Sequence, residues 1–108
     1  QIHTQVSAIE DRFIHIRDLL VEHNVDVSTI NDQIKVVDAK KNQVIADVQI
    51  LKTLYNADPT GYQQSTAKRT ALENAAGKVK TDIEAYISEL KKLRDIFQKV
   101  LVANGYIK

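Results

Sequence analysis

Apolar residues recur at alternating steps of four and three along almost the whole chain. The first series covers residues 2–55 without a slip, and only His23 and Lys41 in it are not apolar. A second series of the same spacing covers residues 62–107 with more polar members. This spacing places one apolar stripe along an α-helix, as in coiled coils, whereas a strand would need alternation at every second residue. The sequence therefore predicts an all-α, coiled-coil-like fold.

Helix-breaking residues are absent from the first half and then arrive together in the middle of the chain. Asp58 followed by Pro59 is typical of a helix start, because the carboxylate accepts free N–H groups and proline needs no donor there. Gly105 near the end is typical of a helix stop. The predicted elements of this single domain (1–108) are a helix over about 2–57, a turn over 56–62 and a helix over about 59–104, forming a long antiparallel hairpin.

Reversal at Pro59 would place residues whose numbers sum to about 117 beside each other. In that register Lys41 comes within reach of Glu73, and Arg69 comes within reach of Asp47. We therefore expect these two cations of the apolar stripes either to form ion pairs or to extend into water.

The stretch 23–29 challenges a continuous first helix, because it is rich in β-branched and capping residues. Asp26 or Ser28 is suited to cap a fresh helix there. The four-three spacing nevertheless passes through the stretch in phase, which favours one helix. The alternatives are a break near residue 26 that gives a three-helix bundle, and dimerisation that gives a four-helix bundle.

The half of the hairpin that holds both termini carries more apolar residues than one pairing stripe can bury. Such a surplus indicates a further packing partner. The candidate interface consists of Phe13, Ile14, Ile16, Leu19, Leu20, Ile87, Leu90, Leu93, Ile96, Phe97 and Leu101.

Residues suited to catalysis or metal binding do not form a recognisable pattern. The chain has no cysteine, three isolated glycines and no phosphate-binding loop, and a two-helix rod has no cleft. We therefore predict no enzyme activity, no cofactor, no metal site and no small-molecule ligand. His23 is a candidate pH-sensitive core residue. Tyr55, Asp58 and Tyr62 are candidate recognition residues at the tip of the hairpin.

The charge balance restricts the partner classes. A net charge of +1 with interspersed signs argues against nucleic acid, and the longest apolar run, residues 100–103, is too short to span a membrane. The leading hypothesis is a non-catalytic protein–protein interaction or oligomerisation module whose partner is a second copy or the remainder of a larger protein. The alternatives are a secreted membrane-active or lipid-binding bundle and an extracellular sensor domain of a receptor. The absence of Met and Cys indicates a segment or mature form of a longer protein and favours a secreted or cell-surface location.

Overall fold

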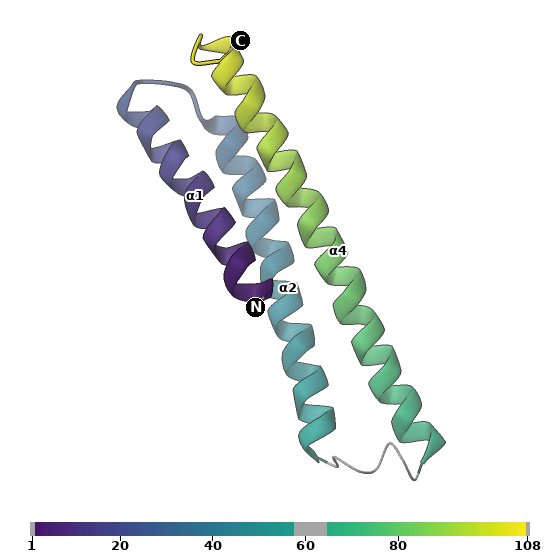
Figure 1. Ribbon diagram of the computed structural model, residues 1–108. Coiled ribbons are helices and arrows are strands. Elements are labelled where there is room, and N and C mark those ends of the chain that lie inside the picture. The colour runs from purple at the N-terminus through teal and green to yellow at the C-terminus, as the bar shows by residue number, and fades with distance from the viewer. Residues whose placement is uncertain (1, 58–64, 108) are drawn as a thin grey trace. The chain divides into compact units, whose positions relative to one another are not determined.

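The computed structural model describes residues 2–57 and 65–107, with side chains from residue 8 onward. They form three helices, α1 (Ile2–Glu22), α2 (Ser28–Ala57) and α4 (Thr66–Ala103), and these ranges contain no strand (Figure 1). The predicted all-helical fold class is confirmed. No helix within the described ranges has the length and apolarity needed to cross a membrane.

A five-residue turn separates α1 from α2, so the single helix predicted over 2–57 is wrong. The amide of Asn24 donates to the carbonyl of Val21, and the amide of Val25 donates to that of Leu20, both at 3.0 Å. Asn24 has a φ of 62°, a left-handed conformation that asparagine tolerates better than most residues. These two bonds satisfy the last carbonyls of α1 and end the helix.

The start of α2 is fixed by the side chain of Asp26. Its carboxylate accepts a 2.9 Å hydrogen bond from the backbone amide of Ser28 and a second bond from the Ser28 hydroxyl. The hydroxyl and then the amide hold the pKa of Asp26 below its ordinary value of 3.8, because both stabilise the charged form. Local capping therefore produces the break near residue 26, which the four-three spacing alone does not reveal.

The first turn of α4 is capped by Ser65, whose hydroxyl accepts a 3.3 Å hydrogen bond from the amide of Lys68. The start predicted at Asp58 and Pro59 lies outside the described residues. The stop predicted at Gly105 is confirmed, because this glycine has a φ of 78° just beyond the helix.

The chain divides into two compact units. The terminal unit consists of Gln1–Val36 and Glu89–Lys108, and the central unit consists of Val37–Ser88. The terminal unit thus contains α1, the first part of α2 and the last part of α4, whereas the central unit contains the remaining parts of α2 and α4.

Within the terminal unit, each of the three helices contacts the other two. A hydrogen bond or a ring stack is present at each pairing, so none of the helices packs on a single neighbour. The apolar side chains that become buried are those of Leu20, Val27, Ile30, Ile34, Leu90, Leu93 and Phe97. The linking contacts are Arg17 Nη1 to Asn31 Oδ1 at 3.2 Å, Phe13 to Phe97 with ring centroids 5.2 Å apart, and Gln33 Nε2 to the Glu89 carbonyl at 2.9 Å.

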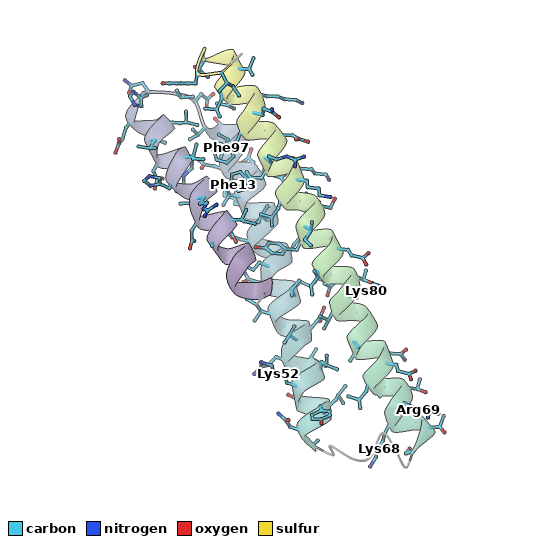
Figure 2. The ribbon with its side chains drawn as sticks, in the orientation of Figure 1. Phe13, Lys52, Lys68, Arg69, Lys80 and Phe97 are labelled. Atoms are coloured by element: carbon cyan, nitrogen blue, oxygen red, sulfur yellow. The ribbon has the colours of Figure 1, made fainter. Side chains whose placement is uncertain are left out.

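The central unit has a thinner apolar core. Val37 and Tyr86 are its buried apolar side chains among the described residues, and Asp47 is also buried, at 5% exposure. Asp47 Oδ1 lies 3.4 Å from Lys78 Nζ, so the pairing predicted with Arg69 is replaced by another. Basic side chains of this unit, including Lys52, Lys80 and Arg69, are exposed (Figure 2).

The cross-helix contacts within each unit show the register between α2 and α4. Gln33 meets Glu89 in the terminal unit, and Asp47 meets Lys78 in the central unit, so the paired numbers sum to 122 and 125. The predicted sum of 117 is therefore displaced by five to eight residues.

Candidate interaction groove between α1 and α4

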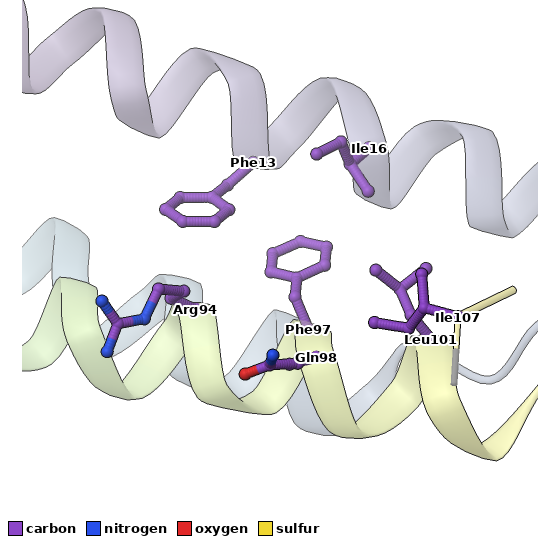
Figure 3. A pocket seen from close by; sticks show the side chains of 7 residues that line it. All are labelled: Phe13, Ile16, Arg94, Phe97, Gln98, Leu101 and Ile107. Carbon is purple, nitrogen blue, oxygen red and sulfur yellow. The ribbon is translucent and has the colours of Figure 1, made fainter.

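An open groove of about 420 Å³ runs between α1 and α4 in the terminal unit (Figure 3). Two residues of α1 form one wall, and the last turns of α4 with the segment that follows form the other. A volume of this size falls within the range of natural binding pockets. The lining residues are Phe13, Ile16, Arg94, Phe97, Gln98, Leu101 and Ile107.

The floor of the groove is a stacked aromatic pair. The rings of Phe13 and Phe97 lie 5.2 Å apart at an interplanar angle of 15°, each projecting from its helix toward the other (Figures 2 and 3). Phe97 is 3% exposed and Phe13 is half-buried. The pair therefore both holds α1 on α4 and presents an apolar surface to the groove.

The walls above this floor remain apolar and open to solvent. Ile16 is 36% exposed and Ile107 is 42% exposed, while Leu101 between them is half-buried. Ile9 lies two helical turns before Ile16, on the same side of α1, and is 44% exposed. These side chains are not covered although all three helices of the unit are already packed.

The polar residues that line the groove are Arg94 and Gln98. The guanidinium of Arg94 lies 3.4 Å from the carboxylate of Asp95, and its side chain remains 63% exposed. Lys91 lies one turn before Arg94 on the same side of α4, and Arg12 lies one turn before Ile16 on α1. An apolar strip with cations beside it suits the apolar face of another helix that carries acidic residues along its flank.

The structure sorts the predicted interface residues into two groups. Four of them, Leu20, Leu90, Leu93 and Phe97, are buried in the core of the terminal unit. The prediction that these four form an external interface is therefore wrong, because the packing of α1 with α2 and α4 buries them. The others remain half-buried or exposed: Phe13, Ile14, Ile16, Leu19, Ile87, Ile96 and Leu101.

The inward face of α1 is rotated relative to the predicted stripe. Ile9 and Ile16 belong to the predicted stripe but are exposed, whereas Glu10 is buried, at 3% exposure, and Arg17 is half-buried. The reason is that α1 packs against two helices, so its inward face extends past the stripe toward α2. The buried carboxylate of Glu10 carries no sequence signature that could have revealed it.

The structure places His23 at the surface, in the turn after α1, rather than in a core layer. Its ring meets the edge of Tyr106 at 6.2 Å and 62°. At the predicted tip, Tyr55 is 48% exposed, whereas Asp58 and Tyr62 lie outside the described residues. Sequence reasoning missed Arg94, Gln98 and Ile107 as groove residues. A signal for two of them was present, because Arg94, Gln98 and Leu101 follow a four-three spacing beside Phe97.

Acidic and histidine side chains do not gather into a site. Within the described ranges, no group of three or more His, Cys, Asp or Glu residues is placed to hold a metal ion. In the central unit Asp47 Oδ2 and Asp82 Oδ2 are buried without a hydrogen-bond partner. The other carboxylate oxygen of Asp47, Oδ1, lies 3.4 Å from Lys78 Nζ.

Comparisons with protein-family models, curated proteins and solved structures find no match to this chain.

Proposed function

We propose that the protein is a non-catalytic helical interaction module. In this proposal the terminal unit is a three-helix bundle, and α2 and α4 pair in the antiparallel, coiled-coil-like manner of a helical hairpin. The groove between α1 and α4 receives the apolar face of a further helix. That helix comes from a second copy of the chain or from the remainder of a larger protein.

The observation that carries the proposal is the exposure of the groove walls. Ile16 and Ile107 of the groove lining, and Ile9 on the same side of α1, stay exposed by 36% to 44% after α1, α2 and α4 have packed together. Complete burial of a fully exposed isoleucine stabilises a complex by about 1.5–3 kcal/mol. Because these residues are less than half exposed, covering each of them should contribute about 1 kcal/mol. Several together are sufficient for measurable association.

Sedimentation velocity across a range of protein concentrations tests this proposal. The expected result is association that Ile16→Glu weakens about tenfold or more, because a carboxylate then has to be desolvated in the groove. The matched control is Ile50→Glu, an exposed isoleucine of the central unit that does not line the groove. This variant should associate like the unchanged protein.

Two outcomes would contradict the proposal. One is a chain that stays monomeric at every concentration and gives no signal with a dye that reports apolar surfaces. The other is equal behaviour of Ile16→Glu and Ile50→Glu. Binding to anionic vesicles that Ile16→Glu abolishes, without self-association, would identify a lipid surface as the partner instead.

A further inference from the structure

The turn between α1 and α2 interrupts a sequence pattern that continues through it. Leu20, Val27 and Ile34 are seven residues apart, and so are Arg17, Asn24 and Asn31. If the five turn residues took helical dihedral angles, α1 and α2 would become one helix. The second set would then lie in a line along its surface, because residues seven apart share one side of a helix.

The contact that holds α1 on α2 is symmetric about the turn. Arg17 donates from Nη1 to Asn31 Oδ1 at 3.2 Å, and each residue is seven positions from Asn24. Two straightened chains crossing antiparallel at Asn24 would bring Arg17 of each copy to Asn31 of the other. The contact now made within one chain would therefore form twice between two chains.

We propose that α1 is an exchangeable arm, so that two copies form a dimer in which each α1 packs on the α2 and α4 of the other copy. The stack of Phe13 on Phe97 and the bond from Arg17 to Asn31 are both retained, but each joins two chains. Exchange of this kind preserves the packed surface and changes only the connecting turn. The inference goes beyond the proposed function, because it concerns which chain supplies α1 rather than what occupies the groove.

Straightening the turn exchanges one set of local contacts for another. Straightening removes the left-handed conformation of Asn24, whose φ is 62°, and adds helical hydrogen bonds. It also removes the capping contact between Asp26 and Ser28. At the crossing point the two Asn24 side chains would face each other, and a paired asparagine at such a position fixes the register of helical dimers.

Because the chain contains no cysteine, engineered cysteines can show which chain supplies α1. The variant Arg17→Cys/Asn31→Cys, treated with a flexible bis-maleimide, links α1 to α2 across the present contact. In the monomer, where α1 packs on its own chain, both cysteines belong to one chain. The crosslinked product then runs at the monomer mass on a denaturing gel. In the exchanged dimer the link joins two chains and doubles the mass. The control pair Gln33→Cys/Glu89→Cys, between α2 and α4, should stay at monomer mass in both states.

Substitution of Asn24 in the Arg17→Cys/Asn31→Cys background should shift the balance in opposite directions. Asn24→Gly favours the left-handed turn, whereas Asn24→Ala favours the continuous helix. We expect the dimer dissociation constants of the two variants to differ more than about tenfold, with the alanine variant the tighter dimer. The inference is overturned if dimers form while the crosslink stays within one chain, if the two variants behave alike, or if every concentration yields monomer alone. The first of these results would leave the groove-based function standing.

Discussion

The stack of Phe13 on Phe97 is the contact most open to quantitative test, because it joins α1 to α4 and forms the floor of the groove. Replacing either ring by leucine keeps an apolar side chain and removes the stack. Phe97 is 3% exposed, so Phe97→Leu should cost about 1–2 kcal/mol of unfolding free energy, while half-buried Phe13→Leu should cost about 1 kcal/mol or less. Both losses fall within a total stability of about 5–15 kcal/mol for a chain of this size.

The informative quantity is the coupling between the two substitutions. Once one ring is gone, the stack is already lost, so the double variant should be less destabilised than the sum of the single variants. Stacked aromatic pairs give a coupling of about 0.5–1.5 kcal/mol beyond their buried area. Urea unfolding of the four proteins, followed by far-ultraviolet circular dichroism, measures it directly.

A matched cycle controls for indirect effects. Gly77 faces open space on α4, with no atom within 4 Å of an added Cβ, so Phe13→Leu and Gly77→Ala should act additively. If Phe13→Leu and Phe97→Leu are also additive within about 0.3 kcal/mol, the rings are not stacked in solution. The packing of α1 on α4, and with it the groove, would then be refuted.

Two further predictions concern single positions. Gly77→Ala should raise the free energy of unfolding by about 1 kcal/mol, because alanine has the higher helix propensity. Gly105→Ala should lower the free energy of unfolding by about 1 kcal/mol, because alanine tolerates the φ of 78° poorly. Thermal unfolding curves of the two variants that shift in the same direction would contradict this pair of predictions. The pKa of Asp26 is lowered in the folded chain, so its contribution to stability is present above the ordinary value of 3.8 and disappears as the pH falls through the lower folded value. Amide protection at the start of α2, measured relative to the intrinsic exchange rate at each pH, should therefore fall on acidification in the unchanged protein but not in Asp26→Asn, and equal acid sensitivity of the two would argue against the cap.

The sequence predicted the inward face of α4 well, because this helix keeps one stripe turned toward its neighbours. Tyr86, Leu90, Leu93 and Phe97 all belong to the predicted series and all are buried, although the last three had also been assigned to the external interface. The helix stop at Gly105 was also predictable, since it depends on local backbone chemistry.

The arrangement of α1 was not predictable from the same spacing. A four-three series shows which side of a helix is apolar, but it contains no information on how many neighbours that side meets. Ile9 is exposed and Glu10 is buried because α1 packs against two helices. The turn before Ser28 was signalled only by residues with low helix propensity, and an apolar series in phase on both sides of the turn outweighed them.

The buried carboxylate of Asp47 has a consequence for how α2 and α4 align in the central unit. A shift of α4 by seven residues in either direction keeps an apolar stripe facing α2. Apolar contacts alone therefore discriminate poorly between neighbouring alignments of the two helices. Such a shift would move Lys78 away and bring Ala71 or Ala85 to its place, leaving a desolvated anion against a methyl group. The ion pair of Asp47 and Lys78 therefore selects one alignment of α2 and α4. It makes the shifted alignments costly but adds little to the stability of the correct alignment.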